Sequence, residues 1–264
     1  MEDLGIEAGV RVERDGAVLI VTLASPGNRN AQTPATWRRL AAIADLVDAT
    51  TRVVLLRAEG KSFSAGLDRR MLTPEAVPGE PSILGLAELD GQQVDEFIQQ
   101  AQAGFTWWSG SHAITIAAVQ GHAIGAGFQL ALACDLILAA EDAQFAMRET
   151  SLGLVPDLGG TGPLVQRIGY QRALEACATG RFIDAQEALR IALVASVHDG
   201  PKLDEAARGL AAAMCATMPG ALVDLKSLLR HAQGASPHEQ LAMERTLQAQ
   251  RIAELSALLA GSRA

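Results

Sequence analysis

The chain has 264 residues, of which 49% are hydrophobic and 4% aromatic, and it carries a formal net charge of −8 at pH 7. This length suffices for one large domain with an aliphatic core, and the acidic balance argues against broad binding of nucleic acid. No apolar run approaches the roughly 18–20 residues of a membrane span. The acidic start Met1-Glu2-Asp3 lacks the basic and apolar regions of a signal peptide, so we expect a soluble cytoplasmic protein.

The three cysteines, Cys134, Cys177 and Cys215, are odd in number and lack the spacing of metal ligands. Each lies in an Ala- and Leu-rich stretch of helical character. We therefore expect all three to be small buried apolar residues, and we expect no metal site.

A β-hairpin is the first predicted feature of the chain. Val10–Arg14 and Ala17–Leu23 alternate around Asp15-Gly16, which is a strong signal for a hairpin turn. A helix is predicted to begin near Thr33-Pro34, with proline in its first turn, and to run to about residue 48. A short buried strand follows at Val53–Arg57.

The middle of the chain repeats the order strand, turn, helix. Leu72–Gly91 is rich in proline and glycine and is predicted to be a long loop, followed by a helix over Gln92–Trp108. A strand at Ile114–Val119, a helix at Gln129–Cys134 and a strand at Leu136–Ala139 come next. This order predicts an α/β fold in which successive units stack.

The pattern is helical almost throughout after Gly169. Ala207–Met218, Ala221–His231 and Pro237–Leu259 each carry apolar residues at intervals of three and four. We therefore predict a core over residues 1–200 and a C-terminal helical region over residues 201–264.

Two glycine-bearing turns, Phe63–Asp68 and Gly121–Gly127, each follow a β-branched strand and precede a helical pattern. Such turns leave backbone N–H groups free at a helix start, and two facing one point would stabilise a negative oxygen. A dinucleotide fingerprint would need a third glycine where Leu130 stands, and a phosphate-binding loop would need Gly-Lys-Ser/Thr. The remaining alternative is a pair of tight turns required only for packing.

The motifs around these turns resemble, in register, those of the crotonase (enoyl-CoA hydratase/isomerase) superfamily. They cover most of the chain, from about Val10 to about Leu229. They are Lys61–Asp68, Ile116–Gly121, Ile124–Gly127, Leu130–Leu136, Phe145–Glu149 and Leu152–Thr161.

The resemblance implies a spiral of ββα units with a C-terminal helical trimerisation region, assembled as a homotrimer or a dimer of trimers. It also implies an acyl-CoA thioester as ligand, whose carbonyl oxygen is held by the backbone N–H groups of Leu67 and Ala126. Fixed donors of this kind stabilise an enolate, so no metal or separate cofactor is expected.

The acid–base residues implied by the resemblance are Glu149, Asp157 and Gln129. Family hydratases place two glutamates beside the substrate, and Glu149 matches one of them, but Gln129 stands where the other is expected. An amide cannot take a proton. Some family isomerases resemble this chain in carrying an aspartate at the position of Asp157. We therefore expect an enolate-forming enzyme that is closer to an isomerase than to an efficient hydratase.

Other interpretations of these residues stay open at this point. Glu149 could form a surface ion pair with Arg148, Asp157 could cap the following helix, and Gln129 could fill space or orient a partner. The whole chain could bind acyl-CoA without turnover, or catalyse decarboxylation or thioester hydrolysis, because a fold does not determine a reaction.

The CoA phosphates require local cations on this acidic protein. By position in the family motif, Lys61 and Arg70 are expected near the phosphates, with Arg29 and Arg69 nearby, and the backbone at Ala65 is expected to contact the adenine. The predicted CoA-binding set is Arg29, Lys61, Ala65, Asp68 and Arg70.

The end of the chain departs from the family pattern. Relatives often finish with a basic tail that closes over CoA, but residues 254–264 contain no Phe and no Lys. The loop Leu72–Gly91 is longer than in typical relatives, so we expect this loop to shape the acyl pocket.

Overall fold

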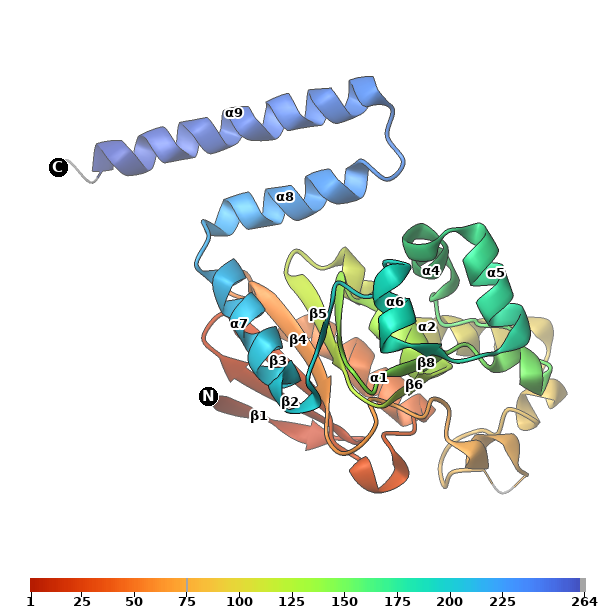
Figure 1. The fold of residues 1–264 in the computed structure, drawn as a ribbon. Helices are drawn as coiled ribbons and strands as arrows, with labels where there is room; N and C mark the ends of the chain where they lie inside the picture. The colour runs from red at the N-terminus through yellow and green to blue at the C-terminus, as the bar shows by residue number, and fades with distance from the viewer. Residues whose placement is uncertain (75, 262–264) are drawn as a thin grey trace.

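The computed structural model describes residues 1–74 and 76–261 (Figure 1). Within these residues the main sheet has the strand order β1-β2-β3-β4-β5-β7-β10, antiparallel from β1 to β3 and parallel from β3 onward. Its strands are β1 (Glu2–Glu7), β2 (Val10–Asp15), β3 (Val18–Leu23), β4 (Val53–Ala58), β5 (Ile114–Val119), β7 (Leu136–Ala140) and β10 (Ser196–His198). The mixed α/β class predicted from the sequence is confirmed.

A second, smaller sheet lies beside the main one. It contains β6 (His122–Ile124), β8 (Gln144–Ala146) and β9 (Ile183–Asp184), in the order β6-β8-β9. A parallel bridge between Ser64 and Ala123 continues from β6 toward the segment after β4. The segments that follow β4 and β5 are therefore brought side by side.

Helices cover both faces of the main sheet (Figure 1). Along β4, Val54 and Leu56 pack with α1, α2 and α3, whereas Val53 and Leu55 pack with α7, as the two-residue period of a strand requires. The helices are α1 (Pro34–Ala42), α2 (Gly91–Gly110), α3 (Ala126–Ala133), α4 (Thr161–Ile168), α5 (Tyr170–Thr179), α6 (Ala185–Arg190), α7 (Leu203–Cys215), α8 (Pro219–His231) and α9 (Pro237–Gly261).

Several predicted boundaries differ from the structure. The helix predicted to reach residue 48 ends at Ala42 and continues as a 3-10 turn over Ile43–Leu46. The long loop contains a 3-10 turn at Gly85–Glu88, and its residue 75 lies outside the described residues. The edge strands β1 and β10 were not predicted, because their burial patterns are mostly exposed or intermediate and carry no clear alternation.

The expectation of three buried cysteines is correct for Cys134, whose burial raises the pKa of its thiol above its ordinary value. It is wrong for Cys177 and Cys215, which are only partly buried. Both lie on the outer helices α5 and α7, where an Ala-rich context does not distinguish a buried from a half-buried position.

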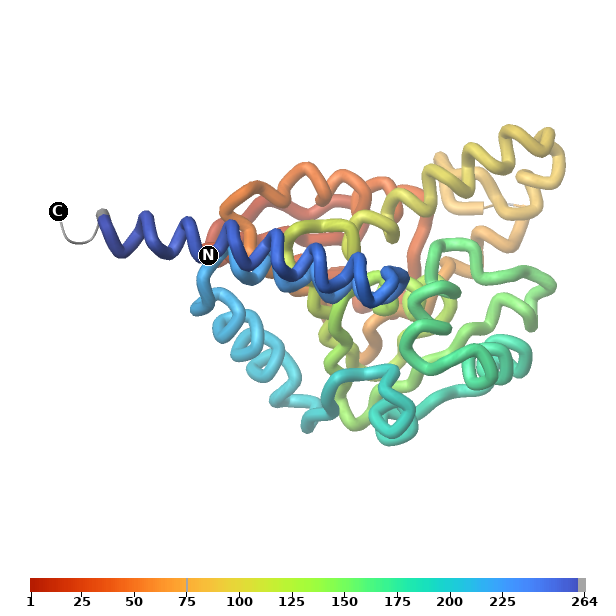
Figure 2. The backbone as a smooth tube through the Cα atoms, turned by 90° about the horizontal axis from the view of Figure 1, so that it is seen from above, coloured from red at the N-terminus to blue at the C-terminus, as the bar shows by residue number. Residues whose placement is uncertain are grey.

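Helices α8 and α9 form a C-terminal arm (Pro219–Gly261). They lie side by side, and the end of α9 projects beyond the rest of the molecule (Figures 1 and 2). Lys226 of α8 attaches the arm to the core, because its buried ammonium group donates to Asp135 Oδ2 and to the Ala113 carbonyl, both at 2.7 Å. Large apolar side chains such as Leu229 and Ile252 are exposed on the arm. The trimerisation role of the arm stays a prediction, and residues 262–264 of the tail lie outside the described residues.

Within the described part of the chain, no single helix is long and apolar enough to span a membrane. One sharply bent pair, Gly200–Cys215 with Pro219–His231, meets that test jointly by length and composition alone.

Candidate functional site

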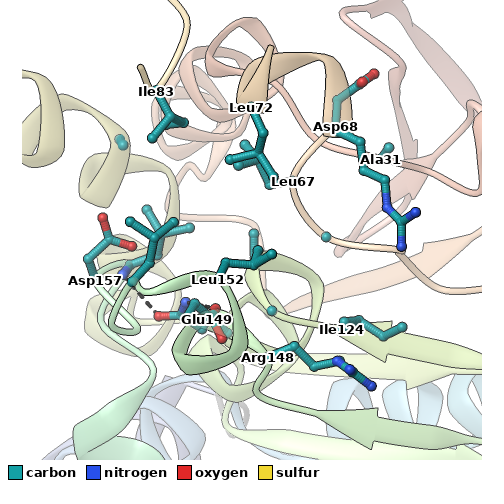
Figure 3. Close-up of a pocket in the computed structure, with 18 of the residues that line it drawn as sticks. Ala31, Leu67, Asp68, Leu72, Ile83, Ile124, Arg148, Glu149, Leu152 and Asp157 are labelled. Atoms are coloured by element: carbon teal, nitrogen blue, oxygen red, sulfur yellow. Dashed lines mark hydrogen bonds between the residues drawn. The ribbon is translucent and has the colours of Figure 1, made fainter. Parts of the chain in front are cut away.

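A cavity of about 1490 Å³ lies where the two glycine turns meet α2 and the segment after β8 (Figure 3). Its lining comes from residues 28–31, 65–72, 83–101, 124–129 and 148–158, together with Trp37 and Phe182. The described lining therefore includes every predicted site residue except Lys61.

The two turns touch at Gly66. This residue has a φ of +84°, and a Cβ built on it would lie 2.4 Å from the Ile124 carbonyl oxygen and 3.5 Å from the Ala126 nitrogen. Only glycine fits both the backbone conformation and the close approach. The residues that follow the two glycine positions are thereby held next to each other at the cavity wall.

The backbone N–H groups of Leu67 and Ala126 are free within the described residues. In the parallel bridge between Gln32 and Leu67, the bonds run from Gln32 N to the Gly66 carbonyl and from Asp68 N to the Gln32 carbonyl, both at 2.8 Å, so the Leu67 N–H is not used. Ala126 is the first residue of α3, where helix geometry leaves the N–H without a partner. Both residues line the cavity.

Glu149 lies against the second turn. A Cβ on Gly125 would stand 3.2 Å from Glu149 Oε1, and Gly125 itself has a φ of +53°. The Glu149 Oε2 atom is buried and has no hydrogen-bond partner among the described residues. Burial raises the pKa of the Glu149 carboxyl above its ordinary value, and the nearby Asp157 carboxylate adds to this effect. The alternative of a surface ion pair with Arg148 is wrong for this geometry.

Gln129 holds Glu149 in place. Its Nε2 donates to Glu149 Oε1 at 2.8 Å, while its Oε1 accepts from the backbone N–H groups of Leu158 (2.9 Å) and Gly160 (3.3 Å). These two backbone donors fix which end of the amide faces Glu149. Gln129 is 1% exposed, so the buried amide positions a partner rather than only filling space, which was one of the open alternatives.

Asp157 lines the same cavity from the segment that follows Glu149 (Figure 3). Burial raises the pKa of its carboxyl above the ordinary value. Helix α4 begins at Thr161 with Gly160 as its N-cap and no side-chain cap. The alternative that Asp157 caps this helix is therefore wrong.

Four of the five predicted CoA-binding residues line the cavity: Arg29, Ala65, Asp68 and Arg70. Arg70 is paired with Asp68 at 2.8 Å, which lowers the pKa of the Asp68 carboxyl. Lys61 is exposed and is not part of the described lining, so its role stays a prediction.

Two features of the site were missed by sequence reasoning. Arg148, treated only as a possible ion-pair partner, lines the cavity with its guanidinium carbon 5.7 Å from the centre of the Phe182 ring. Phe182 comes from the segment before β9 and was not considered at all. A basic residue directly before the motif glutamate was the available signal for Arg148, whereas nothing local distinguishes Phe182.

Comparison with known proteins agrees with this geometry. The family model described as enoyl-CoA hydratase/isomerase matches residues 13–259. A 2,3-dehydroadipyl-CoA hydratase from Escherichia coli (strain K12) is 32% identical over 241 residues, which are 89% of this chain and 87% of that protein.

Solved structures extend the match to the fold. A protein from Thermobifida fusca YX, described as an enoyl-CoA hydratase, was solved in complex with acetoacetyl-CoA; it has a TM-score of 0.90 and 42% identity, covering 94% of this chain and 96% of that one. Its complex with CoA has a TM-score of 0.88 and 42% identity, covering 95% of each chain. The protein described here therefore belongs to the enoyl-CoA hydratase/isomerase family, with the crotonase-like fold that its motifs predicted.

Proposed function

We propose that the protein moves a proton between carbons of an enoyl-CoA thioester, and so shifts its double bond, with Glu149 as the acid–base residue. The observation that carries this proposal is the buried Oε2 of Glu149, which lies beside the turn that presents the Ala126 N–H. Neither group has a hydrogen-bond partner among the described residues. A base beside a site for a negative oxygen is the arrangement that enolate chemistry requires.

The proposed steps use only groups that line the cavity. The thioester carbonyl oxygen accepts hydrogen bonds from the Leu67 and Ala126 N–H groups. Glu149 takes a proton from the carbon next to the double bond, and the electron pair is delocalised onto that oxygen as a dienolate. The same carboxyl then returns its proton to the other end of the conjugated system. Its raised pKa brings both steps nearer to balance at neutral pH.

Gln129 favours this reaction over hydration. Its amide oxygen is occupied by two backbone N–H groups and its Nε2 donates to Glu149, so it has no acceptor to activate a water. Hydration by the pair of glutamates that the family resemblance implies would need a carboxylate there. Asp157 supplies a second carboxyl on the same cavity, where it can hold a proton at the far end of the double-bond system.

An acyl-CoA ligand fits the distribution of charge along the cavity. Arg29, Arg70 and Arg148 lie in the part that includes the first turn and the end of β8, and they would meet the CoA phosphates. The Thermobifida fusca relative binds CoA and acetoacetyl-CoA. We extend this ligand class to the present chain, with no separate cofactor, in a cytoplasmic homotrimer or dimer of trimers.

The proposal is tested by incubating the protein separately with trans-2-enoyl-CoA and 3-enoyl-CoA and following the absorbance of the conjugated thioester. We expect conversion of the 3-enoyl substrate, and a loss of about 10²–10⁴-fold in Glu149→Gln. Glu141→Gln, the same change at an exposed residue outside the cavity, is the matched control. Rapid hydration that survives Asp157→Asn would refute the preference for isomerisation.

Hydration is the second candidate, because the Escherichia coli relative is named a hydratase. If hydration is the reaction, water adds across the double bond of trans-2-enoyl-CoA, and the absorbance of the conjugated thioester falls. Calorimetry separates both reactions from binding alone: tight acyl-CoA binding without isomerisation, hydration, decarboxylation or thioester hydrolysis would identify a non-catalytic member.

A further inference from the structure

A second cavity, of about 200 Å³, adjoins the main one at α2. The two cavities share Trp37, Phe97 and Ala101 as lining residues, and Pro34 and Pro81 add walls to the smaller one. The shared side chains therefore form a partition between the main cavity and a space that the proposed reaction does not use.

Trp37 is the fixed part of this partition. It is 5% exposed, its Nε1 donates to Gln32 Oε1 at 3.0 Å, and its ring meets Phe105 edge-on at 6.3 Å. A Cβ on Gly104 of α2 would lie 2.6 Å from the Trp37 carbonyl oxygen, so α1 and α2 touch at this point. The Trp37 ring is therefore held by Gln32 and Phe105, while the Trp37 backbone packs against α2.

Phe97 is the part of the partition that a substitution can remove. It is only half-buried, and it is the one large side chain that α2 contributes to both described cavities. Val94 lies one turn earlier on the same helix and lines only the main cavity. The helix thus offers two neighbouring apolar residues of which only Phe97 separates the two spaces.

The chemistry of the second cavity suits a hydrocarbon chain. Its walls are largely apolar, and the guanidinium group of its one lining cation within the described residues, Arg38, donates to both carboxylate oxygens of Glu80, at 2.6 Å and 3.3 Å. The Glu80 side chain is 6% exposed. No unpaired charge therefore remains in the described lining to attract a polar group.

We propose that Phe97 determines the length of the acyl group that the protein accepts, by closing the passage from the main cavity into the second one. This inference rests on the proposed function only in placing an acyl-CoA in the main cavity. Once the acyl chain is long enough to reach Phe97, further methylene groups do not raise the affinity of the acyl-CoA, because the Phe97 ring blocks them. Removing the ring joins the two cavities and lets an uncharged alkyl tail continue between Pro34 and Pro81.

The test measures the affinity of saturated straight-chain acyl-CoA thioesters, from butanoyl to hexadecanoyl, by calorimetry on the whole protein. In the unaltered protein we expect affinity to rise with length and then level off. In Phe97→Ala the rise should continue for at least two more carbons, at about fourfold for each methylene group newly buried, which is at least a tenfold gain for the longer thioesters relative to butanoyl-CoA.

Val94→Ala is the matched control, because it widens the main cavity without opening the partition. It should lower affinity without moving the length at which affinity levels off. Thermal melting checks that both variants are folded, and Phe97→Leu provides a milder change. The inference is overturned if affinity stops rising at the same acyl-chain length in Phe97→Ala as in the unaltered protein, or if Val94→Ala shifts that length equally. It is also overturned if affinity in the unaltered protein does not level off at all. If the unaltered protein shows the length limit, and Phe97→Ala extends it, but no isomerisation is detected, the proposed reaction is refuted and the role of Phe97 is not.

Discussion

The cavity wall that carries the two glycine turns is shaped by close backbone contacts, whereas the wall formed by residues 72–101 presents apolar side chains to the cavity. On the first wall, Gly66 approaches the Ile124 carbonyl so closely that no Cβ fits. On the second, the described lining residues are all apolar, and the loop is joined to α1 by the ion pair between Arg38 and Glu80.

We expect this difference to separate the residues that govern the reaction from those that govern which acyl groups bind. A backbone N–H is kept by every replacement except proline. The N–H groups of Leu67 and Ala126, free within the described residues, are therefore set by the course of the backbone rather than by the side chains there. The wall formed by residues 72–101 can be resized one side chain at a time. We therefore expect the first wall to govern the chemistry and the second to govern which acyl groups are accepted.

Among the changes that test the contrast between the two walls, Gly66→Ala is expected to have the largest effect. The new Cβ would lie 2.4 Å from the Ile124 oxygen at a φ of +84°, so the turn must shift and Leu67 must move with it. Loss of one such donor reduces kcat by about 10²–10³-fold. Gly162→Ala on α4, where a Cβ meets open space, is the control and should leave turnover unchanged. Equal turnover in Gly66→Ala would contradict the role of the first turn.

A smaller effect is expected from a substrate with a terminal carboxylate. Among the described residues, the cavity lining from Leu72 to Ala101 contains no cation, and Asp157 lines the same cavity. A carboxylate at the end of the acyl chain would be desolvated without a partner. We expect kcat/KM for such an enoyl-CoA to be at least about tenfold below that for the uncharged chain of equal length. Equal values would show that the acyl wall does not select against charge.

Replacing Glu149 should change the stability of the protein by an amount that depends on pH. The folded-state pKa of Glu149 is raised, so its stabilising contribution is present below its unfolded pKa and is lost as pH rises through the folded value. Above that pH the buried, charged carboxylate lowers the free energy of unfolding. Glu149→Gln should therefore have a higher melting temperature than the unaltered protein. A gain of about 1 kcal/mol corresponds to about 2–4 °C in a chain of this size. The difference should shrink at pH values below about 4.5, and a lower melting temperature at pH 8 would contradict the burial argument.

The smallest effect is expected from Arg38→Gln. It weakens the tie between α1 and the loop, and leaves Glu80 with a neutral partner. Because one side of the pair is exposed, we expect acyl-CoA affinity to fall by only about two- to fivefold. Arg172→Gln, at an exposed cation outside the cavity, is the comparison. A loss as large as that of Gly66→Ala would erase the contrast between the two walls.

Local signals were enough to predict much of the fold and the first wall. The strand at Ile114–Val119 and the hairpin around Asp15-Gly16 follow from short-range patterns, and the two predicted glycine turns follow β4 and β5. Glu149, which the family motifs singled out, lines the cavity, and its catalytic role stays a prediction.

Contacts between distant segments could not be predicted. The partners that fix the Gln129 amide, Leu158 and Gly160, follow it by 29 and 31 residues, and no spacing rule links them. Phe97 lies in a helix whose periodicity does not reveal which residues face a second cavity. The role of a side chain that depends on contacts with another element can be assigned only from the tertiary structure.

The link between Lys226 and Asp135 bears on how the chain can be divided. Asp135 lies just beyond α3, the helix that begins at the Ala126 donor, and Lys226 lies on the C-terminal arm. Deleting or exchanging the arm would strip a partly buried carboxylate of its counter-ion close to that helix. The arm is therefore an unsuitable cut point for making chimaeras or minimal versions of this protein, although in outline it resembles a detachable appendage.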